Sequence, residues 1–383
     1  MMVSLIGTWI QTVAQSWLIF QLTNSAFLLG VVGFLNSIPL LLFSLFGGVM
    51  ADRMNKRNIL IFTQTAFMLL AFLLAFLTHT KLITPAQIMG IAVLNGVVMA
   101  FDAPSRQSMV VELVGKAHLP NAIALNSVAF NSSRVIGPAI AAVLVSTIGM
   151  AGCFYLNGIS FLAVIIALFA IRIGRKSGRA GRSAGALKDL KDGLVFVKEN
   201  QLICVLIAIV GIVSLFGVSY VVLMPVFAND VLKVGVKGLG ALMSCAGLGA
   251  LAGALILARL GDYKYKGRLL FASSFIFSSA LIIFALSRVY AVSLAALVFV
   301  GGASVIAVSL INTILQTSIP DEYRGRVMSV FMLTFAGMLP FGNLMAGSLA
   351  QSFSVSVAVT TGGIFCTLFF IAINVLYPKI RDL

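Results

Sequence analysis

The chain has 383 residues, of which 60% are hydrophobic and 10% charged, and its formal net charge is +15. A soluble domain carries about 25% charged residues, and a mean hydropathy of +1.10 leaves too little polar surface to cover a fold in water. The composition therefore excludes a soluble globular protein and predicts a protein embedded in a lipid bilayer.

Apolar stretches of helical length follow one another along the whole chain. About 20 apolar residues cross the ~30 Å hydrocarbon core as a helix. Runs such as Leu40-Leu41-Leu42-Phe43 are apolar on every side, which favours helices over the alternating strands of a barrel. We predict an all-α membrane protein with twelve spans at 3–22, 27–51, 58–78, 86–103, 121–147, 151–171, 203–224, 237–258, 269–287, 290–315, 326–350 and 355–377.

The basic residues fall on alternate sides of these spans. Of the 26 Lys and Arg, 21 lie in loops on the side of the N-terminus, four lie on the other side, and Arg134 lies inside a span. Because cytoplasmic loops retain positive charge, we expect both termini in the cytoplasm of a cell whose inner membrane holds the chain. A nucleic-acid-binding protein would instead gather its basic residues on one soluble face, so nucleic acid is not an expected partner.

The longest loop separates the first six spans from the last six. We expect an N-terminal six-helix bundle at 1–171, a cytoplasmic basic linker at 172–201 and a C-terminal six-helix bundle at 202–383. The segment from Leu187 has apolar residues at helical spacing, so it is either an amphipathic helix on the membrane surface or a plain linker. Sequence features recur between the halves at an offset of about 210 residues, which predicts two pseudo-symmetric bundles of the same orientation.

Polar residues inside the spans are candidates for a central cavity. Ser4, Thr8, Gln11 and Gln15 follow helical spacing on one face of the first span, where they either bond neighbouring helices or line a cavity. Prolines inside spans predict bends; they are Pro39, Pro138, Pro225 and Pro340. The candidate cavity residues are Gln11, Gln15, Asn36, Asn131, Arg134, Tyr220, Asn312 and Asn343.

Two charged residues in or at the ends of the spans, Arg134 and Asp102, are candidates for different roles. A charge deep in a membrane costs about 2.5–3.5 kcal/mol to insert, so Arg134 is expected to face a wet cavity and to bind an anionic or oxygen-rich molecule. Asp102 lies at the predicted inner end of the fourth span, where it either meets water or titrates in proton coupling.

A charged turn between the second and third spans is a candidate for conformational gating. The turn serves topology alone, or Asp52 pairs with a helix N-terminus and with neighbouring guanidiniums and so holds the halves together. Gly137 and Pro138 in the fifth span serve helix packing or a bend that seals the cavity. The gating candidates are Gly48, Asp52, Arg53, Lys56, Arg57, Gly137 and Pro138.

These motifs are also similar to those of a known family. The stretch from Gly47 to Arg57 resembles the signature between helices two and three of the major facilitator superfamily, and the stretch Arg134 to Ala142 resembles its antiporter motif. The wider pattern looks like the branch of the enterobactin, macrolide and multidrug exporters. The resemblance implies that Asp52 touches the start of the eleventh helix. It also implies a basic tail before the first helix, so we expect that helix to be truncated here.

The function that follows is secondary active export by alternating access. We expect a bulky, partly apolar small molecule such as a siderophore or drug, possible proton antiport, a monomer and no cofactor. An enzyme would need a cluster of acids or histidines within the spans, and the sequence has none there. The four cysteines lack metal-ligand spacing. A non-transporting receptor or scaffold is the alternative, followed by an importer or a membrane lipid enzyme.

Overall fold

The computed structural model describes residues 2–171, 186–261 and 263–382. In this part of the chain, twelve helical segments are long and apolar enough to cross a membrane. The prediction of an all-α membrane protein with twelve spans is therefore confirmed, and most predicted ends lie within a few residues of the observed ones.

The first half of the described chain consists of five helices, one of which contains two spans. They are α1 (Met2–Thr23), α2 (Ala26–Arg53), α3 (Lys56–His79), α4 (Pro85–Thr147) and α5 (Gly149–Ala170). The long helix α4 turns at Gly115, whose φ of +69° is a conformation that side chains disfavour. Its two spans are therefore Pro85–Gly115 and Leu125–Thr147.

Polar caps mark where three helices of this half begin, namely α2, α3 and α4. The Ser25 side chain accepts a hydrogen bond from the Leu28 N–H, and Asn55 does the same for Arg57. Thr84 and Gln87 form a reciprocal capping box at the start of α4. Each cap satisfies an N–H group that the helix itself leaves unpaired, which allows tight connections between antiparallel spans.

The second half begins with an irregular span that includes Pro225. It runs through α7 (Gln201–Ile212), the π-helix η1 (Val213–Gly217), the 3₁₀-helix η2 (Ser219–Leu223), α8 (Met224–Val226) and the π-helix η3 (Phe227–Val231). The remaining helices are α9 (Gly235–Leu260), α10 (Lys266–Leu286), α11 (Tyr290–Ser318), α12 (Asp321–Ser352), α13 (Val355–Leu376) and η4 (Pro378–Asp382).

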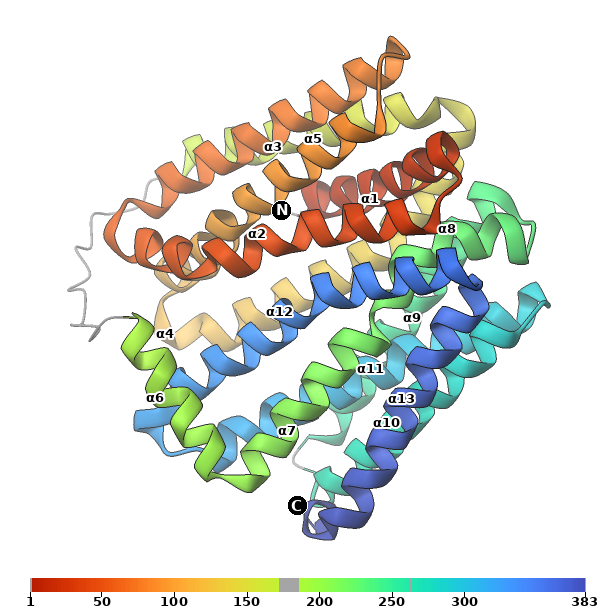
Figure 1. The fold of residues 1–383 in the computed structure, drawn as a ribbon. Coiled ribbons are helices and arrows are strands. Elements are labelled where there is room, and N and C mark those ends of the chain that lie inside the picture. Colours follow the sequence, from red (N-terminus) through yellow and green to blue (C-terminus); the bar gives the residue numbers. More distant parts are fainter. Residues whose placement is uncertain (1, 172–185, 262, 383) are drawn as a thin grey trace.

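Figure 1 shows the helices of the two halves as neighbouring groups, with α2 beside α12 along the boundary. The second span of α4 packs against α9 and forms the other main contact between the halves. We call the end of the molecule where α2 finishes and α12 starts the α6 end, because the short helix α6 (Ala186–Glu199) lies there. The opposite end, where α12 finishes, is the Gln351 end.

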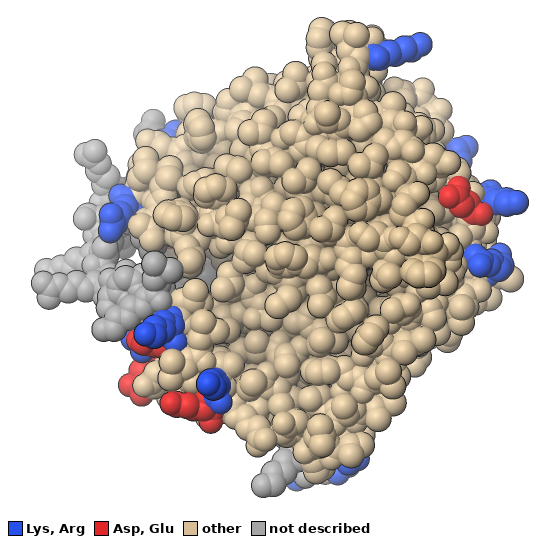
Figure 2. All heavy atoms as spheres, in the orientation of Figure 1, with Lys and Arg blue, Asp and Glu red and all other residues tan. Residues whose placement is uncertain are grey.

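The outer surface has the character that a lipid environment requires. Figure 2 shows a broad face without charged residues, and the Lys, Arg, Asp and Glu side chains gather toward its margins. Large apolar side chains point outward from many helices; Phe62, Leu125 and Phe353 are each more than 70% exposed. In water such exposure would be unfavourable, whereas lipid tails solvate it.

The helix α6 packs against the first turns of α12. The ring of Phe196 stacks on Tyr323 with centroids 4.4 Å apart, and Asp192 pairs with Arg326 at 3.7 Å. Leu194 on the same helix is exposed. A helix is therefore present where the sequence leaves a choice between an amphipathic helix and a plain linker, and one of its faces is bound to the second half.

Close backbone contacts join the two halves toward the Gln351 end. A Cβ atom at Gly30 would lie 2.6 Å from the backbone oxygen of Asn343, and one at Gly347 would lie 2.8 Å from the Gly30 Cα. Beyond them, the Ser25 hydroxyl donates a hydrogen bond of 2.9 Å to Gln351. Contact continues to Leu41, whose side chain reaches Gly337 near the middle of both helices. The absence of side chains at the glycines thus lets α2 and α12 touch directly.

Candidate functional site

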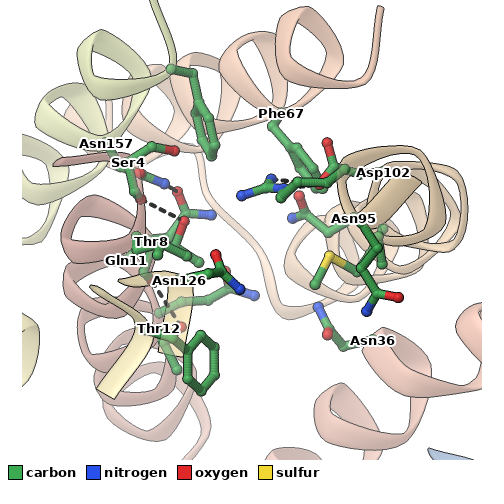
Figure 3. Close-up of a pocket in the computed structure, with 18 residues that line it drawn as sticks. Ser4, Thr8, Gln11, Thr12, Asn36, Phe67, Asn95, Asp102, Asn126 and Asn157 are labelled. Carbon is green, nitrogen blue, oxygen red and sulfur yellow. Dashed lines mark hydrogen bonds and ion pairs between the residues drawn. The ribbon is translucent and has the colours of Figure 1, made fainter. Parts of the chain in front are cut away.

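A cavity of about 390 Å³ lies among the helices of the first half. Its walls come from α1, α2, α3, both spans of α4 and α5, and Figure 3 shows polar side chains converging on it from several of these helices. The lining residues are Ser4, Leu5, Thr8, Gln11, Thr12, Gln15, Asn36, Phe67, Asn95, Met99, Asp102, Ala103, Arg106, Gln107, Asn126, Phe130, Asn157 and Phe161.

One wall is the polar face of α1. Ser4, Thr8, Gln11 and Gln15 all line the cavity, because their spacing places them on one side of the helix. The Asn157 amide of α5 donates a hydrogen bond of 2.7 Å to the Gln11 side chain. The face therefore both bonds a neighbouring helix and lines the cavity, the two alternatives that the sequence leaves open.

The opposite wall contains a buried carboxylate. Asp102 is 1% exposed, and its Oδ1 accepts hydrogen bonds from Thr63 at 2.8 Å and Gln64 at 2.7 Å. Its Oδ2 accepts from the Arg106 guanidinium, at 3.0 Å from Nε and 2.5 Å from Nη2. Paired and hydrogen-bonded in this way, the charge of Asp102 is stabilised away from bulk water.

Arg106 is a charged lining residue that the sequence interpretation misses, as it misses the lining amides Asn95, Asn126 and Asn157. The predicted span ends at residue 103 and places Arg106 in a loop, but the helix continues to Gly115. The prediction is wrong because an Asp and an Arg four residues apart pair on one helix face, so their charges need not end a membrane helix. The spacing of four residues between Asp102 and Arg106 could have indicated from the sequence that the helix continues through both.

The predicted cavity residues do not all meet in this cavity. Gln11, Gln15, Asn36 and the proton-coupling candidate Asp102 line it. The other five candidates are not among its lining residues; they are Asn131, Arg134, Tyr220, Asn312 and Asn343.

Arg134 lies at the contact between α4 and α9. A Cβ atom at Gly247 of α9 would lie 2.7 Å from the Arg134 carbonyl oxygen. The Arg134 side chain is half-buried and interacts electrostatically with the buried Tyr220 of the other half. The role of Arg134 in binding remains a prediction, now with a position at the boundary between the halves.

The three asparagines outside the cavity have other neighbours. Asn343 is buried where α12 meets Gly33 of α2. Asn312 accepts a hydrogen bond of 2.6 Å from Gln316, one turn further along α11. Asn131 donates to the Ser127 carbonyl at 2.9 Å within its own helix. Local bonds thus occupy the amides of Asn312 and Asn131, whereas Asn343 sits in the packed interface.

The charged turn contains two basic residues that bind within the first half. Lys56 pairs with Glu112 of α4. Arg57 donates hydrogen bonds to the carbonyls of Leu168 at 2.7 Å and Phe169 at 3.0 Å, in the last turn of α5. Arg57 therefore caps a helix C-terminus, where unpaired carbonyls favour a cation. Arg53 is exposed, and the side chain of Asp52 lies outside the described residues.

The glycine and proline candidates for gating lie in different surroundings. A Cβ atom at Gly48 would meet nothing within 4 Å, whereas one at the adjacent Gly47 would lie 2.0 Å from the Ala100 carbonyl. Gly137 packs against Trp9 of α1, and the Pro138 carbonyl lies 2.5 Å from the Cβ position of Gly240 in α9. Their gating roles remain predictions.

Replacing Arg57 with Gln should destabilise the first half, because a neutral amide cannot replace the guanidinium at both carbonyls. We expect a loss of about 1–2 kcal/mol, since the hydrogen bonds are charged but partly open to solvent. The measurement is the apparent Tm of purified protein in detergent. Arg53→Gln removes the same charge from an exposed position and should leave Tm unchanged; an equal fall in both variants would contradict the capping role.

These helices and this cavity define the class: a multi-pass membrane protein whose spans surround a polar cavity. The chain belongs to the family described as "Transmembrane secretion effector", a branch of the major facilitator superfamily, which matches residues 1–382. The resemblance inferred from the motifs is thereby confirmed. The family and the fold are those of membrane transporters.

Two relatives are similar to the chain along most of its length, and one solved structure shares its fold. The chain is 27% identical to the staphyloferrin A transporter of Staphylococcus aureus, over 91% of this chain and 87% of that protein. It is 25% identical to the multidrug efflux pump Tap of Mycolicibacterium fortuitum, over 90% and 86%. The crystal structure of a D-xylose–proton symporter shares the fold, with a TM-score of 0.79, 12% identity and coverage of 100% and 98%.

Proposed function

We propose that the protein is a secondary transporter that exports a bulky, partly apolar small molecule from the cytoplasm by alternating access. The observation that carries the proposal is the cavity, whose amides and hydroxyls are interleaved with Phe67, Phe130 and Phe161. Such a surface suits a molecule with both polar and apolar parts. The siderophore and drug transporters among the relatives favour the same substrate classes and export.

The position of the close contacts between α2 and α12 supports loading from the cytoplasm. The close contacts between α2 and α12 lie between their midpoints and the Gln351 end, from Leu41–Gly337 to Ser25–Gln351. The distribution of basic residues supports a cytoplasmic location for the α6 end. Together these features support a state that is closed outside and open inside, in which an exporter takes up its substrate.

We further propose that proton entry drives export, with Asp102 as the titrating group. It is a buried carboxylate in the cavity wall, and a proton there would remove the charge that holds Arg106. We propose that the protein works as a monomer in the cytoplasmic membrane, without a cofactor.

Reconstituted vesicles test both proposals. With the α6 end facing outward and an acidic interior, wild-type protein should accumulate substrates from a panel of siderophores and drugs, and dissipating the pH gradient should reduce accumulation. Asp102→Asn should lower accumulation at equal protein content. The control Asp321→Asn removes an exposed acid at the same end, away from the cavity, and should have no effect. Wild-type protein that moves no compound would favour the receptor or scaffold alternative.

A further inference from the structure

We infer that Arg106 selects an anionic substrate, by binding a carboxylate of the transported molecule through the guanidinium edge that Asp102 leaves free. The inference rests on the proposed function, since it assumes that this cavity receives the transported molecule. From the sequence, an anionic molecule is expected at Arg134; the inference instead names a carboxylate as the group bound and Arg106 as the residue that selects it.

The first step is the hydrogen-bond inventory of the guanidinium. An arginine side chain has five N–H donors. Nε and Nη2 of Arg106 each donate to the same oxygen, Oδ2 of Asp102. This leaves both N–H groups of Nη1 and one of Nη2, and the described residues provide no further hydrogen-bond partner for Arg106. Those donors form the second edge of the fork, which matches a carboxylate in a bidentate arrangement.

The second step is access. The Arg106 side chain is 27% exposed and lines the cavity, whereas the Asp102 side chain is 1% exposed. Thr63 and Gln64 hold the other oxygen of Asp102 from α3, so the carboxylate is fixed behind the guanidinium. Asp102 is thus a positioning residue, and the charge that the cavity offers to a ligand is positive.

The third step is the charge of the other walls. The helices α1 and α5 contain no Asp, Glu, Lys or Arg. The described charged residues of α2 and α3 lie at the α6 end, where Lys56 and Arg57 have partners of their own. Of the residues that line the cavity, Asp102 and Arg106 are the acidic and basic ones. A cationic ligand would meet repulsion from Arg106, while an anion would gain a charge-assisted bond.

The fourth step concerns the rest of the ligand. Gln11, Asn36, Asn95 and Asn126 offer amides that can both donate and accept, so they suit hydroxyl, amide and carbonyl groups. The cavity volume of about 390 Å³ accommodates a small organic acid or one end of a larger molecule. The chemistry therefore fits a carboxylate that also carries hydroxyl or amide groups.

A binding experiment on purified protein in nanodiscs tests this without requiring transport. Citrate and its neutral trimethyl ester share a skeleton and differ in charge, and calorimetry gives the affinity of each. We expect wild-type protein to prefer citrate, and Arg106→Gln to weaken citrate binding about 10- to 100-fold while changing ester binding little. Arg106→Lys keeps the charge but loses the planar fork, so its citrate affinity should lie between those of wild-type protein and Arg106→Gln.

Two further variants separate positioning from general damage. Asp102→Asn keeps the shape of the residue and should reduce the preference for citrate, because the weaker partner no longer fixes the guanidinium. Arg259→Gln removes an exposed cation from the second half and should leave the preference unchanged. Wild-type protein that binds citrate no better than the ester, or an unchanged preference in folded Arg106→Gln, would overturn the inference.

Failure of the anion-binding inference can be distinguished from failure of the transport proposal. If wild-type vesicles move solutes but Arg106→Gln keeps the citrate preference, the substrate class is wrong and transport stands. If the preference depends on Arg106 but no solute moves in any vesicle experiment, the anion site stands as a binding site and the transport proposal fails.

Discussion

Gly30→Ala should shift the protein away from the state described here, toward one in which α2 and α12 separate at the Gln351 end. The added Cβ would lie 2.6 Å from the Asn343 oxygen and 2.9 Å from the Gly347 Cα. Both are backbone atoms and cannot rotate away. Overpacking of this kind costs about 1–3 kcal/mol, which corresponds to a change of about 5- to 150-fold in the conformational equilibrium.

Pulsed electron resonance between spin labels at positions 27 and 353 measures this shift. Phe27 and Phe353 are exposed at the Gln351 end, so labels there should not disturb packing once the native cysteines are replaced. The longer-distance population should grow in Gly30→Ala and in Gly347→Ala, whose Cβ would also meet backbone atoms. Gly90→Ala is the control, because its Cβ would meet no atom within 4 Å. Identical distance distributions in all four proteins would refute the prediction.

Asp102→Ala should destabilise the first half more than any removal of an exposed acid. The change leaves Arg106 without its partner and Gln64 without the acceptor for its amide, while the Gln64 Oε1 already has no described partner. Breaking a fully buried ion pair costs about 3–5 kcal/mol. Because Arg106 is partly open to the cavity, we expect about 1–3 kcal/mol, seen as a lower apparent Tm.

The double variant Asp102→Ala/Arg106→Ala separates the pair from other effects. It removes the unpaired cation as well, so it should be more stable than the sum of the two single losses predicts. Asp321→Asn at an exposed position should leave Tm nearly unchanged. Additive losses in the double variant would show that the ion pair is not what stabilises this wall.

The spans could be predicted from the sequence because lipid solvates them, so their apolar length is a local property. The error came at the fourth span, where Asp102 and Arg106 suggest a helix end but neutralise each other inside the helix. The seventh span leaves α-helical geometry on both sides of Pro225, which itself lies in the short helix α8. Pro39 and Pro340, by contrast, lie inside α2 and α12.

The candidate site was less accessible to sequence analysis, because it depends on which helices meet. The polar face of α1 could be identified from spacing alone, and it does line the cavity. Asn343 has an equally polar side chain, but the contact of α12 with Gly33 removes it from the cavity. Gly47 and Gly48 are neighbours in sequence, and only the three-dimensional packing shows that the Ala100 carbonyl lies against the first of them.

The half-buried guanidinium of Arg106 also bears on the energetics of transport across a membrane. If Arg106 binds the negative charge of the substrate, each turnover carries that charge outward, toward the positive side of a bacterial membrane. The membrane potential contributes about 2.3 kcal/mol per elementary charge per 100 mV. Export would then be electrogenic, and the voltage that drives it would add to the pull of entering protons. An anion-binding cavity would thus draw on both components of the proton-motive force.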